Sequence, residues 1–159
     1  MVGEKARRLR QRERRDVIRA VAEHDIGYHT NYHSVHPTPS EYLADLGWEE
    51  GIAEFDRREC GGLLDVQDVF GKRCSTYGQP GGSWAPHVYP VLRQWGVPTY
   101  VDEGQHIGLN DQPFWYGGVL TAYRMRSRCT RMKLGGGENL RAGREDFDRI
   151  AEELTDAGG

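Results

Sequence analysis

The chain has 159 residues, which is enough for one domain with a buried core. Its formal net charge of −3 gives no overall attraction to nucleic acid or to an anionic membrane. Charged residues make up 28% and hydrophobic residues 37% of the chain, and no apolar run resembles a membrane span or a signal peptide. We therefore expect a soluble protein, located in the cytoplasm unless a leader is missing from the sequence.

The cysteines do not form a recognisable framework. Cys60, Cys74 and Cys129 are widely spaced and include no Cys-x-x-Cys pair. This pattern argues against a zinc ribbon and against a set of disulfides. We expect buried or half-buried free thiols.

The amino-terminal part predicts a basic helix. Met1 to Gly3 has the character of a strand end, and a helical apolar pattern continues from Glu4 to Glu23, with a break allowed near Arg12. We interpret the helix as a solvated outer face rather than a nucleic-acid-binding surface, because no aromatic residues interleave with its basic residues. The basic residues are Lys5, Arg7, Arg8, Arg10, Arg12, Arg14, Arg15 and Arg19.

The next segment holds half of the six histidines of the chain. Ile26 to Tyr28 predicts a short buried strand, and a loop with His29, His33 and His36 follows it. The run Thr-Pro-Ser-Glu at 38–41 is a capping box with proline at the first helical position, which predicts a helix start.

Glycines divide the following helical region. Gly47 interrupts the first helix, and the pattern then predicts one helix over 48–58 and a second, short helix over 63–70. Gly71 is expected to end the second helix.

A strand, a glycine-rich loop and a helix come next. Residues 74–77 predict the strand, and the loop over 78–84 allows the backbone to approach a ligand closely. Ser83 is expected to cap the helix, which has Pro86 in its first turn, runs to about Trp95 and ends at Gly96.

The carboxyl-terminal part predicts further strands. Residues 97–101 form one strand, with Asp102 and Glu103 at its carboxyl end. The remaining segments are, in order, a strand within 114–123, an irregular basic stretch over 124–143 and an amphipathic helix over 144–157.

Strands that alternate with helices favour an α/β fold with parallel strands. The histidine loop, the loop with Gln79, and Asp102 each follow a strand. Since the carboxyl ends of parallel strands meet at one edge, we expect these three features to lie on the same rim.

The spacing of His29 and His33 suggests a metal site. Side chains four residues apart lie on one face of a helical turn, and two imidazoles suit Zn²⁺, with Co²⁺ or Ni²⁺ as substitutes. A third ligand is usually a carboxylate. His36 is expected to be a loop residue or an indirect contact, since Pro37 follows it. A polar loop without a metal remains the alternative.

Residues 25–33, Asp-Ile-Gly-Tyr-His-Thr-Asn-Tyr-His, resemble the second motif of the polysaccharide deacetylase (NodB-homology) family. That motif has two histidines separated by three residues, with a small hydroxyl residue after the first. Met1 to Gly3 resembles the strand end upstream of the motif, and residues 74–84 stand where the family has Arg-x-Pro-Tyr-Gly. Residues 86–102 resemble the next helix and strand, so the resemblance covers about residues 1–105.

The resemblance implies a distorted (β/α) barrel that removes acetyl groups from N-acetylated carbohydrates, a C–N amide bond rather than a peptide bond. It implies a divalent metal, usually zinc, and His29 and His33 match the two histidine ligands. The substrate would be a carbohydrate or a small N-acyl compound. Gln79, Pro80 and Trp84 are the residues expected to contact it.

The family's first motif, with two aspartates, and its last motif, with a histidine, have no counterpart here. Gln79 also replaces the family's arginine. We therefore expect residues 1–159 to be a single partial deacetylase-like domain that binds zinc weakly and has impaired activity. Asp102 is the best-placed carboxylate for a catalytic role. The alternative is a non-catalytic carbohydrate- or metal-binding domain, and the oligomeric state is left open.

Overall fold

The computed structural model describes residues 1–80, 84–102, 113–123, 145, 148–149 and 152. The chain forms two compact units, Met1–Arg124 and Met125–Gly159. In the second unit the described residues have helical backbone, in agreement with the helix predicted over 144–157. The irregular stretch predicted over 124–143, Glu103 and Cys129 lie outside the described residues.

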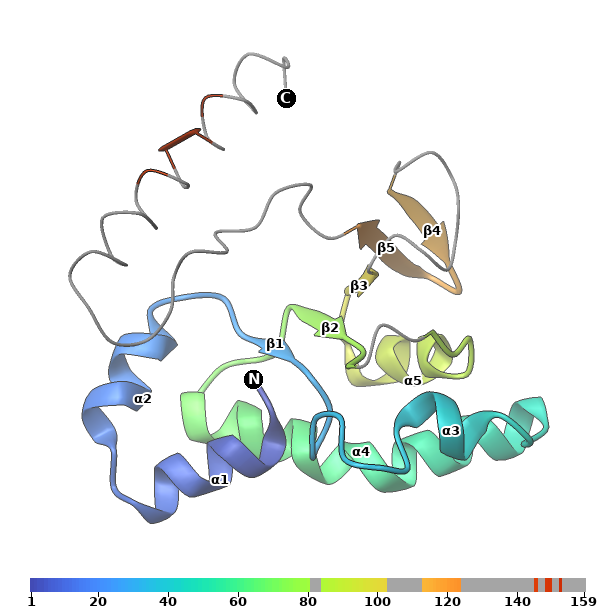
Figure 1. The fold of residues 1–159 in the computed structure, drawn as a ribbon, viewed down its shortest axis with the longest axis horizontal. Helices are drawn as coiled ribbons and strands as arrows, with labels where there is room; N and C mark the ends of the chain where they lie inside the picture. Colours follow the sequence, from blue (N-terminus) through green and yellow to red (C-terminus); the bar gives the residue numbers. More distant parts are fainter. Residues whose placement is uncertain (81–83, 103–112, 124–144, 146–147, 150–151, 153–159) are drawn as a thin grey trace. The chain divides into compact units, whose positions relative to one another are not determined.

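The first unit contains a mixed five-stranded sheet in the order β1-β2-β3-β5-β4 (Figure 1). Each of the pairs β1–β2, β2–β3 and β3–β5 is parallel, and β4 is antiparallel to β5. The strands are β1 (Gly27–Tyr28), β2 (Thr76–Gly78), β3 (Thr99–Asp102), β4 (Phe114–Tyr116) and β5 (Val119–Tyr123). The predicted α/β fold with parallel strands is confirmed.

The amino-terminal residues pair with β1. The amino group of Met1 donates to the carbonyl of Gly27, and the backbone N–H of His29 donates to the carbonyl of Met1 at 2.9 Å. This is the bonding of a parallel ladder, as expected for a strand end. The predicted break near Arg12 is also confirmed, because helix α1 (Gly3–Gln11) and helix α2 (Arg15–Ala22) are separate.

The amino-terminal arginines make ion pairs with the fourth helix, α4 (Trp48–Phe70). Arg7 bonds Asp65 at 2.6 Å, and Arg10 bonds Asp68. Part of the basic face is therefore neutralised within the fold.

The prediction of two helices over 48–58 and 63–70 is wrong, because α4 is continuous through Gly61 and Gly62. Close packing explains Gly62. A Cβ atom there would lie 2.6 Å from the hydroxyl of Tyr28 and 2.8 Å from Cγ of Asn31. Gly71, with φ of +66°, ends the helix as predicted.

Two other predicted elements need correction. Helix α5 (Val88–Trp95) begins after Pro86 rather than around it, and it ends at Gly96 as expected; Ser83 lies outside the described residues. The single strand within 114–123 is a hairpin of β4 and β5. Its two turn residues, Gly117 and Gly118, have φ of +57° and +84°, which a two-residue hairpin turn with both φ positive requires.

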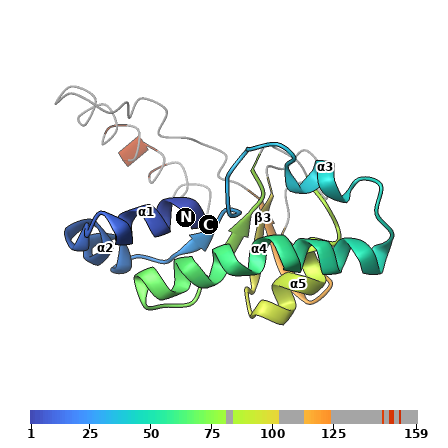
Figure 2. The same cartoon turned by 90° about the horizontal axis from the view of Figure 1, so that it is seen from below.

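Helices α4 and α5 pack on one face of the sheet (Figure 2). The side chains of Tyr28, Tyr77 and Tyr100 form a row across three neighbouring strands and are at most 1% exposed. Phe55 of α4 packs on Tyr77 with ring centroids 5.8 Å apart, and Tyr89 of α5 stacks on Tyr100 at 5.1 Å. This aromatic layer is the centre of the core.

Cys74 is buried and Cys60 half-buried, and both are free thiols, as predicted. None of the helices within the described ranges is long and apolar enough to cross a membrane.

Candidate metal site and adjoining pocket

The histidine loop leaves the carboxyl end of β1 in a conformation that is not helical. Thr30 and His33 have φ of +57° and +61°, in the left-handed region that non-glycine residues rarely adopt. The Thr30 hydroxyl donates to the His33 carbonyl at 3.2 Å. The turn brings the His29 and His33 rings to a centroid distance of 4.9 Å, as the metal-site prediction requires. Two left-handed residues, rather than a helical turn, produce this proximity.

His29 is held by the neighbouring strand. Its Nδ1 lies 2.6 Å from the carbonyl oxygen of Gly78 at the end of β2. Because a carbonyl only accepts, Nδ1 carries the proton, and in the neutral ring Nε2 then has a free lone pair. Burial lowers the pKa of His29 below its ordinary value, an effect that the hydrogen bond to Gly78 opposes and the neighbouring His33 reinforces. His29 is therefore mainly neutral at pH 7, the form in which imidazole binds metal.

His33 is exposed, and its Nδ1 lies 2.7 Å from the Ser34 hydroxyl. A serine hydroxyl both donates and accepts, so it fits either neutral tautomer of the ring. When it accepts from Nδ1, the Nε2 of His33 also has a free lone pair.

His36 points to a different partner. Its Nδ1 lies 2.8 Å from the carboxylate of Glu41, in the first turn of helix α3 (Pro39–Leu43). The same carboxylate accepts the backbone N–H of Thr38 at 2.7 Å, and these two bonds lower the pKa of Glu41, the Thr38 bond more than the His36 bond. The predicted capping box is confirmed, and His36 is bound to it.

A third metal ligand is not found within the described part of the chain, where no three His, Cys, Asp or Glu side chains cluster. Asp102 is the last residue of β3, at the carboxyl edge of the sheet as expected. Its backbone pairs with Tyr123 of β5. Its catalytic role stays a prediction.

The predicted substrate-contacting residues fall in two places. Gln79 and Pro80 follow β2 directly and are buried, with Gln79 only 6% exposed. Trp84 is half-buried and packs edge-on against Tyr89 and Tyr116, and its Nε1 donates to the Tyr89 hydroxyl at 3.3 Å. The described contacts of Trp84 thus belong to an aromatic cluster with Tyr89 of α5 and Tyr116 of β4.

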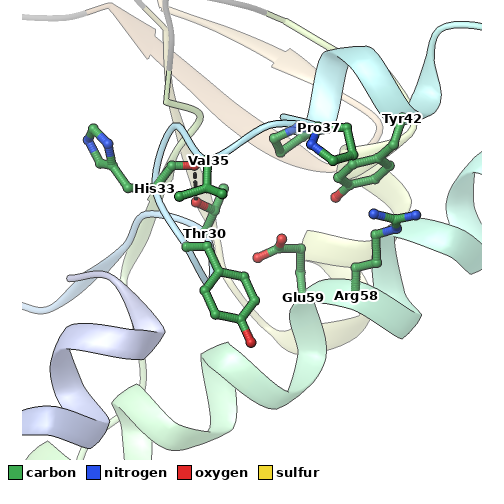
Figure 3. Close-up of a pocket in the computed structure, with 9 residues that line it drawn as sticks. Thr30, His33, Val35, Pro37, Tyr42, Arg58 and Glu59 are labelled. Carbon is green, nitrogen blue, oxygen red and sulfur yellow. Dashed lines mark hydrogen bonds between the residues drawn. The ribbon is translucent and has the colours of Figure 1, made fainter.

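A pocket of about 110 Å³ lies between the histidine loop, α3 and α4 (Figure 3). Its lining consists of Thr30, Tyr32, His33, Val35, Pro37, Pro39, Tyr42, Arg58 and Glu59.

Glu59 is the residue of this pocket that sequence reasoning missed. It is 5% exposed, and burial raises the pKa of its carboxyl group although two hydrogen bonds oppose the shift. The donors are the Tyr28 hydroxyl at 2.6 Å and the Asn31 backbone N–H at 2.7 Å. Its place in the helix was a usable signal: it stands four residues after Phe55 and four before Leu63, on the buried side of α4.

Comparison with known proteins finds no matching family model and no significant match among curated proteins or solved structures.

Proposed function

We propose that His29 and His33 bind a divalent cation, and that the protein is a hydrolase that deacetylates N-acetylated carbohydrates. Zn²⁺ is the cation that suits the two histidines best. The observation that carries this proposal is the paired rings, 4.9 Å apart, with His29 bonded through Nδ1 to the Gly78 carbonyl. A backbone carbonyl on the second nitrogen is one of the usual arrangements around a metal-ligating histidine. The resemblance of residues 25–33 to the deacetylase motif supports the same assignment.

The donor set fits zinc, since two neutral imidazoles are among its preferred ligands. When bound, such a cation polarises an amide carbonyl and acidifies water. The residues of this chain have distinct tasks in the proposal. Gly78 fixes the tautomer and orientation of His29, and Thr30 holds the turn that places His33. Asp102 is the proposed catalytic carboxylate.

A partial (β/α) barrel is the architecture we propose for this site. Each parallel strand along the chain, from β1 through β2 and β3 to β5, is added to the same side of the sheet. Helices α4 and α5 lie on one face of it (Figure 2). The sequential strand order and the helices on one face are both features of a (β/α) barrel, in which the other face of the sheet lines the interior.

Metal binding tests the proposal first. Zn²⁺ and Co²⁺ affinities are measured by calorimetry for the wild type, His29→Ala and His33→Ala, with His24→Ala as the control because His24 is exposed and outside the loop. We expect each loop variant to lose about tenfold or more in affinity, at least the loss seen when a supporting contact of a ligand is removed. Unchanged affinity in both loop variants would refute the metal site.

Turnover separates the hydrolase from a non-catalytic carbohydrate- or metal-binding domain. Acetate release from N-acetylglucosamine oligomers is measured with added Zn²⁺ or Co²⁺. We expect slow release from this chain, lost in His29→Ala and in Asp102→Asn. Metal binding without any release would leave the non-catalytic alternative, and release that survives Asp102→Asn would exclude Asp102 as the catalytic carboxylate.

A further inference from the structure

The pocket beside the histidine loop contains two polar groups with unused hydrogen-bonding capacity. Both hydrogen bonds to the Glu59 carboxyl group reach Oε2, so Oε1 makes none with a described residue. The hydroxyl of Tyr42 is buried and has no partner within the described residues. A buried polar group without a partner is costly, so a ligand that satisfies it gains free energy.

These two groups face the same space. Figure 3 shows the carboxyl group of Glu59 and the hydroxyl of Tyr42 directed into the pocket, with Pro37 above them and Val35 to one side. The ring of His33 points away from it (Figure 3). The pocket is thus chemically separate from the proposed metal site, although the same loop forms both.

The charges of the pocket offset one another. The pocket is lined by one acidic side chain, Glu59, and by one basic side chain, Arg58, whose guanidinium lies 4.4 Å from the Tyr42 ring centroid. Arg58 is already paired with Glu54, and burial of Glu59 disfavours its charged form, so neither side chain presents a full, free charge to a ligand. Neither an anion nor a cation therefore has a clear electrostatic advantage, and a neutral ligand loses least hydration on entry.

We propose that this pocket binds a small neutral amide, with its N–H donated to Glu59, its carbonyl accepting from Tyr42 and its apolar substituent against the prolines. An amide carries a donor N–H and an acceptor oxygen on the same carbonyl carbon, and the two unsatisfied groups need one of each. The volume of about 110 Å³ accommodates a few non-hydrogen atoms. The inference requires no metal and stands or falls separately from the proposed hydrolase function.

Acetamide is the probe, titrated into the full chain in EDTA and followed by NMR shifts of residues in the histidine loop. We expect saturable binding in the millimolar range, since a ligand of about four non-hydrogen atoms has little binding energy available. Tyr42→Phe should weaken binding about threefold to tenfold, the effect of one hydrogen bond. Tyr116→Phe, which removes a tyrosine hydroxyl from the β4–β5 hairpin, should leave it unchanged.

A thermal melt of each variant controls for loss of folding. Because the Tyr42 hydroxyl has no described partner, Tyr42→Phe should keep or slightly raise the melting temperature. Acetate and methylammonium test the neutrality of the site, and both should bind more weakly than acetamide. Three results would overturn the proposal: no saturable acetamide binding, equal binding by Tyr42→Phe, or tighter binding of either ion. Zinc affinity is measured separately, so a failure of the metal site does not affect this outcome.

Discussion

The two faces of the parallel sheet differ in the size of their side chains. On the helix-covered face, Tyr28, Tyr77 and Tyr100 stand side by side and are almost fully buried. On the opposite face, the residues that precede these tyrosines in the same three strands are small. They are Gly27, Thr76 and Thr99, which pair with one another in register. Strands of two to four residues can supply both rows because successive side chains alternate.

One face of the sheet contributes mainly to stability, and the other carries a residue of the candidate metal site. The aromatic face packs against α4 and α5 and contains the largest buried side chains. The position after Tyr28 points to the other face. There His29 reaches across to the carbonyl of Gly78, which follows Tyr77, the register partner of Tyr28. A large side chain at 78 would approach the His29 ring, since even a Cβ there would lie 3.6 Å from Nδ1.

Removing a ring from the aromatic layer should have the largest effect. Phe55 is 0% exposed and packs between Tyr77 and Trp95. Phe55→Ala should lower the free energy of unfolding by about 3–5 kcal/mol, from lost burial and the cavity left behind. Urea denaturation followed by circular dichroism measures it.

The matched control is Trp115→Ala, because Trp115 is a larger ring but is 70% exposed on the edge strand β4. Its effect should stay within about 0.5 kcal/mol. Equal losses in the two variants would show that the aromatic layer is not the main source of stability.

Local signals in the sequence were enough to predict several boundaries. The capping box at Thr38 starts α3, and Gly71 and Gly96 end α4 and α5, because each depends on a few adjacent residues. The predicted gap between residues 58 and 63 is wrong, and it contains Gly61 and Gly62. Its glycine at 62 is required by Tyr28 and Asn31, which are distant in the sequence, and no local pattern contains that contact.

In the candidate site, too, the features that depend on adjacent residues could be predicted, and those that depend on tertiary contacts mostly could not. The spacing of His29 and His33 predicted that their rings lie together, and they do. The Gly78 carbonyl that holds His29, and the pocket around Glu59, depend on how β2 and α4 pack against the loop. Such tertiary contacts could be inferred only in part, from the position of Glu59 on the buried side of a helix.

The glycine pair in α4 gives the second prediction. Gly62→Ala should destabilise the protein by about 1–3 kcal/mol, because its Cβ would overlap the Tyr28 hydroxyl and Asn31 and push the histidine loop away. Gly61→Ala is the control in the next position, with nothing within 4 Å of its Cβ. It should stabilise the helix by about 0.5–1 kcal/mol, the difference in helix propensity. Thermal melts of both variants give the comparison, and a shared sign would contradict the packing role of Gly62.

The smallest effect is a change in how stability varies with pH, and it has opposite signs for Glu59 and His29. Burial raises the pKa of Glu59 above 4.5, so the folded state keeps this proton to higher pH than the unfolded chain. Its contribution to stability is complete below the unfolded pKa and is lost as pH rises through the folded one. Burial lowers the pKa of His29 below 6.5, so its contribution is complete above pH 6.5 and is lost as pH falls through the folded pKa.

The two contributions can be separated with Glu59→Gln and His29→Asn, which keep polar side chains at both positions. Relative to the wild type, Glu59→Gln should become more stable as pH rises above 4.5, because a buried charge is avoided. His29→Asn should gain relative stability as pH falls below 6.5, since the folded wild type resists protonation there. Unfolding free energies from urea titrations at several pH values provide the measurement. Curves parallel to the wild type would mean that neither group is buried enough to shift its pKa, and the opposite pKa shifts of Glu59 and His29 would be refuted.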